Sequence, residues 1–113
     1  MYVVKLQTIP SLDSLSKFLK KHANVLVFVT GKYCPSCQKQ QRTIRQSLSE
    51  IRIDYPDLSL ICIDGNVFQQ WLLEQFNLQC IPALLCYKDE QCIYKIVGYQ
   101  SITEIELLLE NYY

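Results

Sequence analysis

The sequence predicts an α/β fold in which helices cover both faces of a mixed central β-sheet. Two runs, Val25–Thr30 and Leu58–Asp64, are largely apolar, and the first is also rich in β-branched residues, which is typical of strands buried on both faces. Helical patterns alternate with these runs, as in parallel β-α-β units. The polar turn at 88–91 separates two further apolar runs and indicates an antiparallel hairpin. A sheet with both kinds of connection is mixed.

The first half of the chain supplies two of the expected helices. Val3–Leu6 is a candidate for a short first strand. Ser11 then caps a helix with one apolar stripe, which ends near His22. After the first central strand, residues 35–53 contain no glycine and predict a long helix, with Pro35 in its first turn, where proline is tolerated.

The third helix is expected to follow the second central strand directly. Gly65 and Asn66 open it, because Asn66 and Gln69 have the spacing of a capping box. Asn77 closes it, since asparagine is frequent just after the last turn of a helix.

The last part of the chain predicts a hairpin and a helix. Ala83–Lys88 and Gln91–Val97 are its two strands. Ser101 and Glu104 then form a capping box, which predicts the start of the final helix. The apolar residues on one face of this helix are Ile102, Ile105, Leu108, Leu109 and Tyr112. The expected order is therefore β-α-β-α-β-α-β-β-α.

Length and charge limit the possible functions. The 113 residues predict a single domain, 1–113. Eleven Lys plus Arg balance eleven Asp plus Glu, so no net field favours nucleic acid or anionic lipid. The N-terminal residues lack a secretory pattern, and no apolar run is long enough to cross a bilayer. We expect a cytoplasmic monomer that binds neither nucleic acid nor membrane.

Three of the six cysteines have strand-like surroundings. Cys62, Cys86 and Cys92 lie within apolar runs, where a free cysteine usually behaves as a small buried hydrophobe. A cytoplasmic location keeps such thiols reduced. We therefore expect no disulfide framework among them.

The pair Cys34 and Cys37 has a different setting, at the start of the long helix and the carboxyl end of a central strand. Residues three apart on a helix face the same way and lie about 5–6 Å apart, which suits a disulfide. Unpaired N–H groups and the helix dipole favour the thiolate of Cys34. Basic residues flank the pair, namely Lys32, Lys39, Arg42 and Arg45.

A zinc site is the alternative reading of the pair. Structural zinc takes four ligands, commonly from two Cys-x-x-Cys pairs. A second pair is absent, because Cys80, Cys86 and Cys92 are spaced six residues apart. We therefore expect no metal.

Four features in register make the sequence resemble the thioredoxin family over nearly its whole length. They are an apolar strand, Cys-Pro-Ser-Cys at a helix start, Cys-Ile-Pro at 80–82 before the hairpin, and Val97-Gly98 at its end. The resemblance implies a thioredoxin-like fold and a cis Ile81-Pro82 bond. It also implies that Cys34 is the attacking thiolate and Cys37 the resolving thiol of a thiol:disulfide oxidoreductase.

The same resemblance implies the rest of the site and its partners. Its substrate-binding residues would be Tyr33, Pro35, Ser36, Ile81, Pro82 and Gly98. Cys80 would lie near the groove and is a candidate regulatory thiol. The substrates would be protein disulfides, the electron donor a thioredoxin reductase or another thiol, and no cofactor is needed besides the Cys34–Cys37 dithiol.

Three departures from the family pattern leave alternatives open. Thioredoxins carry Gly-Pro between the cysteines, and have a buried acidic residue and a buried lysine where this chain has Phe28 and Leu60. A binding module or redox sensor with little turnover is therefore a second hypothesis. Glutaredoxins share Cys-Pro-x-Cys, but the glycine pair and acidic residue of their glutathione site are absent from 87–91, so deglutathionylation is only an alternative.

Overall fold

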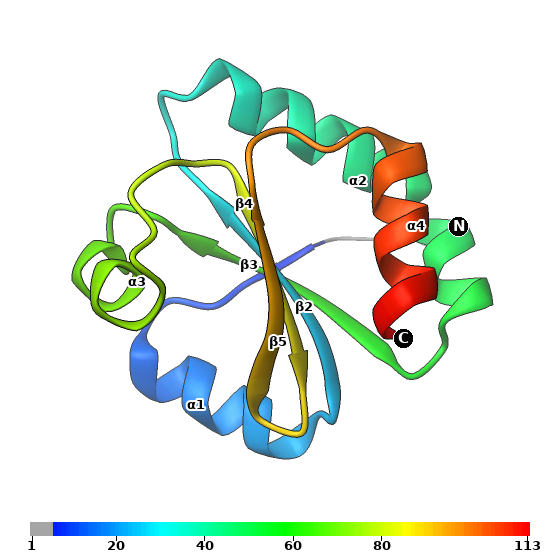
Figure 1. The fold of residues 1–113 in the computed structure, drawn as a ribbon, viewed down its shortest axis with the longest axis horizontal. Coiled ribbons are helices and arrows are strands. Elements are labelled where there is room, and N and C mark those ends of the chain that lie inside the picture. Colours follow the sequence, from blue (N-terminus) through cyan, green and yellow to red (C-terminus); the bar gives the residue numbers. More distant parts are fainter. Residues whose placement is uncertain (1–5) are drawn as a thin grey trace.

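The computed structural model describes residues 6–113, which contain one five-stranded sheet with the strand order β1-β3-β2-β4-β5 (Figure 1). The elements in chain order are β1 (Gln7–Thr8), α1 (Leu12–Lys21), β2 (Asn24–Thr30), α2 (Pro35–Asp54), β3 (Leu58–Asp64), α3 (Gln69–Phe76), β4 (Ala83–Lys88), β5 (Gln91–Val97) and α4 (Ile102–Tyr112).

The sheet is mixed and covered on both faces, as predicted. β3 is parallel to β1 and β2, whereas β4 is antiparallel to β2 and β5. Helices α1 and α3 lie on one face, and α2 and α4 lie on the other (Figure 1). None of the helices within residues 6–113 is long and apolar enough to cross a membrane.

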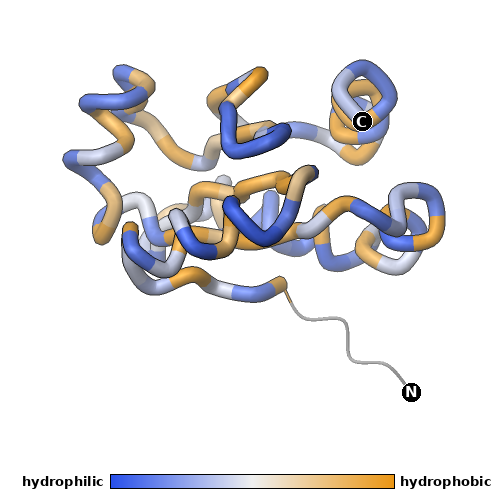
Figure 2. Tube along the Cα trace, turned by 90° about the horizontal axis from the view of Figure 1, so that it is seen from below, coloured by the Kyte–Doolittle hydropathy of each residue, from blue (hydrophilic) through white to orange (hydrophobic). Residues whose placement is uncertain are grey.

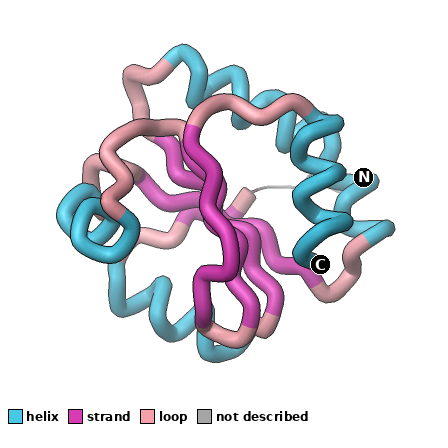
Figure 3. The backbone as a smooth tube through the Cα atoms, viewed as in Figure 1, coloured by secondary structure: helices cyan, strands magenta, loops and turns pink. Residues whose placement is uncertain are grey.

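Strand register brings several loops to one end of the sheet. Thr30 pairs with Asp64, and Ala83 pairs with both Val29 and Val97. The carboxyl ends of β2, β3 and β5 therefore lie beside the start of β4. The loops that continue from these ends gather along one edge of the molecule (Figure 3). The segment carrying Cys34 is one of them.

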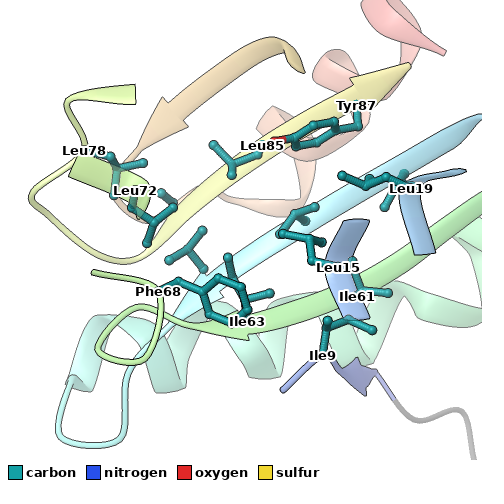
Figure 4. Packing of buried hydrophobic residues seen from close by; sticks show 14 residues of the cluster. Ile9, Leu15, Leu19, Ile61, Ile63, Phe68, Leu72, Leu78, Leu85 and Tyr87 are labelled. Carbon is teal, nitrogen blue, oxygen red and sulfur yellow. The ribbon is translucent and has the colours of Figure 1, made fainter. Parts of the chain in front are cut away.

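The hydrophobic core has two parts, one on each face of the sheet. On the α1 and α3 side, Leu15 of α1 and Phe68 meet Ile61 and Ile63 of β3 (Figure 4). On the other side, α2 and α4 pack against residues such as Phe28 of β2. Hydrophobic colour accordingly runs along the strands in the middle of the molecule (Figure 2). Burial on both faces explains why β2 and β3 are apolar almost throughout.

The single tryptophan lies in the first of these two parts. Trp71 on α3 makes edge-to-face contacts with Phe68 and Phe76, with ring centroids 6.0 and 5.3 Å apart. Such arrangements suit the ring quadrupoles. Trp71 is thus on the face of the sheet opposite to α2.

The strand cysteines are buried largely as expected. Cys62 and Cys86 are buried, and Cys92 is half-buried. Burial raises the pKa of all three thiols, that of Cys86 to about 12. A raised pKa keeps each one protonated and unreactive near neutral pH.

The beginning of the sheet differs from the prediction. Of the expected strand Val3–Leu6, residues 3–5 lie outside the described residues, and Leu6 is not in a strand. β1 is instead Gln7–Thr8, which pairs with Ile61 and Cys62 of β3. The short apolar run therefore predicted an edge strand close to the right place but not in the right residues.

The start of α3 was predicted wrongly. The helix begins at Gln69, and Asn66 does not cap it. Asp64 takes part in the turn instead, because its Oδ1 accepts from the Asn66 N–H at 2.8 Å and its carbonyl from the Phe68 N–H at 3.0 Å. Aspartate side chains compete with helical hydrogen bonds in this way. The predicted end is confirmed, since Asn77 is the C-cap with φ 50°.

The hairpin and the final helix match the prediction. Asp89 and Glu90 both have positive φ, as the mirror-image two-residue turn between β4 and β5 requires. Ser101 caps α4, with a reciprocal hydrogen bond from its own N–H to Glu104. Small differences remain elsewhere, since β2 begins at Asn24 and α2 continues to Asp54.

Candidate active site

Cys34 and Cys37 are joined in a disulfide at the start of α2. Their Cα atoms are 5.1 Å apart. Cys34 is the N-cap, in an extended conformation, and its Sγ accepts a hydrogen bond from the Cys37 N–H at 3.1 Å. Pro35 begins the helix, where its missing N–H leaves no helical bond unmade. The local sequence thus places both sulfur atoms at the positive end of the helix dipole.

The two cysteines of the disulfide differ in exposure. Cys34 is half-buried, whereas Cys37 is fully buried. Pro35 and Ser36 between them are exposed, and the Ser36 hydroxyl lies 3.4 Å from Cys34 Sγ. A partner molecule can therefore contact Cys34 but not Cys37.

Tyr33 extends into solvent with 98% of its surface exposed. The structure therefore does not pack it against the other predicted groove residues. It stands directly before the accessible sulfur, at the tip of the loop that follows β2.

Ile81 and Pro82 lie where the loops converge, and the peptide bond between them is cis, as the resemblance implied. Pro82 is buried. The half-buried Ile81 side chain points toward the glycines that follow β2 and β3. A Cβ built on Gly31 would lie 2.5 Å from Ile81 Cδ1, and one on Gly65 would lie 2.9 Å from Ile81 Cγ2. A side chain at either position would therefore require the Ile81 side chain to shift, and at Gly65 it would also lie 3.3 Å from the Thr30 carbonyl oxygen.

Gly98 is held beside Pro82 by a main-chain hydrogen bond. The Gly98 N–H donates to the Pro82 carbonyl at 2.8 Å. Gly98 has φ +96°, a conformation that residues with a side chain rarely adopt. Gly98 and Pro82, two of the predicted groove residues, are therefore in direct main-chain contact.

Gln40 and Gln100 were missed by sequence reasoning. Gln40 on α2 is fully buried and makes two hydrogen bonds to the main chain of Gln100. Its Oε1 accepts from the Gln100 N–H at 2.6 Å, and its Nε2 donates to the Gln100 carbonyl at 3.0 Å. The signal in the sequence is weak, because glutamine is also common on solvated helix faces.

Tyr99, the residue before Gln100, makes a second attachment between the segment that precedes α4 and helix α2. Its hydroxyl lies 2.8 Å from Thr43 Oγ1, and Lys39 Nζ lies 4.4 Å from the centre of its ring. Lysine over an aromatic face is a favourable contact. One of the basic residues beside the dithiol therefore has a partner within the chain.

The other basic side chains near the dithiol are exposed. Lys32, Arg42 and Arg45 are all at the surface. Within residues 6–113 the one salt bridge is between Lys17 and Asp13 of α1. Lys32 and the first half of α2 therefore carry positive charge that forms no salt bridge with a described carboxylate.

Phe28 and Leu60 are buried in the core between the sheet and the two helices α2 and α4. Neither side chain ionises. The structure thus places apolar core residues at the two positions where thioredoxins have a buried acidic residue and a buried lysine.

Cys80 is exposed, as its place before Ile81 predicted. A hollow of about 380 Å³ lies between α3 and this segment, and Ile81, Gln79 and Leu73 form part of its wall. Within the part of the chain that the structure describes, no three His, Cys, Asp or Glu residues are placed to share a metal ion.

A family described as a thioredoxin-like domain matches residues 13–113. No curated protein matches the chain.

Several solved thioredoxins share the fold. That of Malassezia sympodialis has a TM-score of 0.79 and 15% identity, with 99% of this chain and 96% of that chain covered. A mutant thioredoxin from Halobacterium salinarum has a TM-score of 0.78 and 20% identity, with 96% and 90% covered. The oxidised thioredoxin of Plasmodium falciparum has a TM-score of 0.76 and 17% identity, with 96% and 98% covered.

Proposed function

Because the chain belongs to the thioredoxin-like domain family, we propose that it is a thiol:disulfide oxidoreductase that reduces or exchanges protein disulfides through Cys34 and Cys37. One observation carries this proposal, the unequal exposure of the two cysteines of a disulfide at a helix start. An accessible sulfur beside a buried one is what an attacking and a resolving thiol require.

The first step is attack by the Cys34 thiolate on one sulfur of a substrate disulfide. A bond forms between Cys34 Sγ and that sulfur, and the substrate S–S bond breaks. The leaving sulfur departs as a thiolate and takes a proton from water. The Cys37 N–H and the Ser36 hydroxyl, which lie 3.1 and 3.4 Å from Cys34 Sγ, favour its negative charge before attack.

The second step releases the substrate. Cys37 loses its proton and attacks Cys34 Sγ, so the Cys34–Cys37 disulfide forms and the mixed disulfide breaks. The two electrons have then passed from the dithiol to the substrate, which leaves with two thiols. With Phe28 and Leu60 apolar, the base for Cys37 would be water or the departing substrate thiolate.

The substrate chain would lie along Ile81, Pro82 and Gly98, with Tyr33, Pro35 and Ser36 on the side of the dithiol. Electrons for the next cycle would come from a thioredoxin reductase or another thiol, with no resident cofactor. Cys80 is exposed next to Ile81, so we propose that oxidation or a mixed disulfide at this thiol would interfere with docking.

Trapping with cysteine variants tests the roles of the two sulfur atoms. Cys37→Ser leaves the attacking thiol but removes the resolving one, so incubation with oxidised insulin should accumulate a mixed disulfide on a non-reducing gel. Cys34→Ser should accumulate none. The reverse pattern would exchange the assigned roles, and no adduct with either variant would refute the proposal.

The reduction potential of the Cys34–Cys37 couple decides the direction of transfer. It is measured by equilibrating the protein with glutathione or dithiothreitol buffers of defined potential. A value near about −270 mV, as in thioredoxin, supports net reduction of substrates. A value near about −180 mV, as in protein disulfide isomerase, supports oxidation or exchange.

A binding module or redox sensor with little turnover is the second candidate, and the apolar Phe28 and Leu60 favour it. Without an ionisable group at either position, release of the mixed disulfide would be slow. Turnover of insulin with dithiothreitol as reductant separates the candidates. Sustained turnover that is lost in Cys34→Ser favours the enzyme, whereas one slow round per molecule favours the sensor.

A further inference from the structure

We infer that Gln40 is a positioning residue for the substrate groove, an inference that rests on the proposed function. Its buried amide holds the segment 98–100 at a set distance from the dithiol helix. Gln40 touches neither sulfur nor, in the proposed mechanism, the substrate. It acts through Gln100 and Gly98 on the main chain at Pro82.

The Gln40 side chain pairs with the main chain of a single residue. Gln40 Oε1 and Nε2 bind the N–H and the carbonyl of the same residue, Gln100, at 2.6 and 3.0 Å. The side chain thus pairs with the backbone as a neighbouring strand would. Two parallel hydrogen bonds define both distance and orientation, whereas an apolar contact at this place would permit sliding.

The pairing continues to the groove without a gap. Gln100 Nε2 donates to the Gly98 carbonyl at 3.3 Å, and the Gly98 N–H donates to the Pro82 carbonyl at 2.8 Å. Gln40 itself is three residues after Cys37 on α2. A chain of hydrogen bonds therefore runs from the dithiol helix to Pro82.

Burial gives the pairing its importance. Gln40 is fully buried and Gln100 is 6% exposed, so water cannot replace the lost bonds easily. If the Gln40 amide were absent, the N–H and carbonyl of Gln100 would lack partners in the interior, which is strongly unfavourable. The segment 98–100 would move to recover them, and Gly98 would move with it.

A matched pair of variants separates positioning from stability. Gln40→Leu removes the amide but keeps most of the volume. Ser47→Ala is the control, because Ser47 is a second buried polar residue of α2 whose bond, to the Thr43 carbonyl at 3.0 Å, stays within the helix. Both variants lose hydrogen bonds of a buried side chain, but only Gln40→Leu loses the bonds to the segment 98–100.

Insulin reduction with dithiothreitol as reductant is the first readout. For Gln40→Leu we expect KM to rise about tenfold with kcat within twofold, and the rate of Cys34 alkylation by iodoacetamide to stay within twofold. Ser47→Ala should leave all three within twofold. An unchanged KM in Gln40→Leu overturns the inference.

Amide hydrogen exchange is the second readout, and it does not depend on activity. In Gln40→Leu the Gly98 amide should exchange at least tenfold faster than in the wild type, and in Ser47→Ala it should not. If the wild type fails to reduce insulin, the proposed function falls, and unchanged Gly98 exchange would separately overturn the positioning role.

Should Gln40→Leu not fold, Gln100→Ala, which removes only the bond to the Gly98 carbonyl, should show about a threefold rise in the same KM and exchange rate.

Discussion

The Cδ1 atom of Ile81 occupies space that a Cβ atom at position 31 would need. An ideal Cβ on Gly31 lies 2.5 Å from it, closer than real Cβ contacts, and the next atom of the side chain is 4.0 Å away. Gly31→Ala therefore requires Ile81 to move. Because this atom is the end of a flexible, half-buried side chain, we expect the free energy of unfolding, measured by urea denaturation, to fall by only about 1 kcal/mol.

A second substitution, at Ile81, should relieve this clash. Ile81→Val lacks Cδ1, so Gly31→Ala combined with Ile81→Val should be more stable than the sum of the single changes allows. A coupling of about 1 kcal/mol in the double-mutant cycle is expected. Additive effects would show that the cost of Gly31→Ala arises elsewhere.

The hydroxyl of Ser36 should help to stabilise the Cys34 thiolate. Its Oγ lies 3.4 Å from Cys34 Sγ, and the Cys37 N–H and the helix start also favour the charged form. We expect the pKa of Cys34 in the reduced protein to lie below the ordinary thiol value, and Ser36→Ala to raise it. The ultraviolet absorbance of the thiolate as a function of pH measures both. Ser49→Ala, an exposed change on the same helix, is the control and should leave the curve unmoved.

Buried thiols should make the fold sensitive to alkali. Burial raises the pKa of Cys86 to about 12, so the unfolded chain loses this proton at lower pH than the folded chain does. Stability from this group is therefore full below the ordinary thiol pKa and falls as the pH rises toward about 12. We expect a loss of about 1 kcal/mol by roughly pH 9.5.

Cys86→Ala tests the source of this loss. Denaturation at several pH values gives the free energy of unfolding as a function of pH. Above the ordinary thiol pKa this free energy should fall less steeply in the variant, by the slope that corresponds to about one proton, whatever the stability of the variant at neutral pH. Cys62 and Cys92 have raised pKa values for the same reason, so some decline remains. Burial also raises the pKa of Tyr87 and Tyr113, which adds a further decline at still higher pH.

The capping box of α4 should contribute measurably to stability. Ser101 Oγ accepts from the Glu104 N–H at 3.2 Å, and Glu104 Oε1 accepts from the Ser101 N–H at 3.1 Å. Ser101→Ala should lower the free energy of unfolding by about 1 kcal/mol. Thr103→Ala, at an exposed position of the same turn, should change it by less than half as much. Equal losses would contradict a capping role.

Local patterns predicted most of the fold because its elements carry their own signals. β3, β4 and β5 begin and end where their apolar runs do, and Ser101 and Asn77 mark helix ends as capping chemistry requires. The start of α3 failed for an equally local reason. Asn66 has the spacing of a helix cap, but its N–H donates to the Asp64 side chain. The chain therefore forms a turn at this point, and the helix does not start at Asn66.

Some features of the candidate site could also be predicted from the sequence, and others could not. The Cys34–Cys37 disulfide follows from spacing at a helix start, and the resemblance located the cis bond before Pro82. The Gln40 pairing could not be predicted, because its two residues are 60 positions apart and meet only once the sheet and α2 have packed. Helical periodicity alone does not distinguish a buried glutamine from a solvated one.

The position of Trp71 makes it a useful optical probe of this molecule. It is the one tryptophan, it packs between Phe68 and Phe76 on α3, and the dithiol helix lies on the other side of the sheet. Its fluorescence should therefore follow unfolding of the α1 and α3 layer with similar baselines in the oxidised and reduced protein. The difference between the two melting curves would then give the contribution of the disulfide to stability without a label.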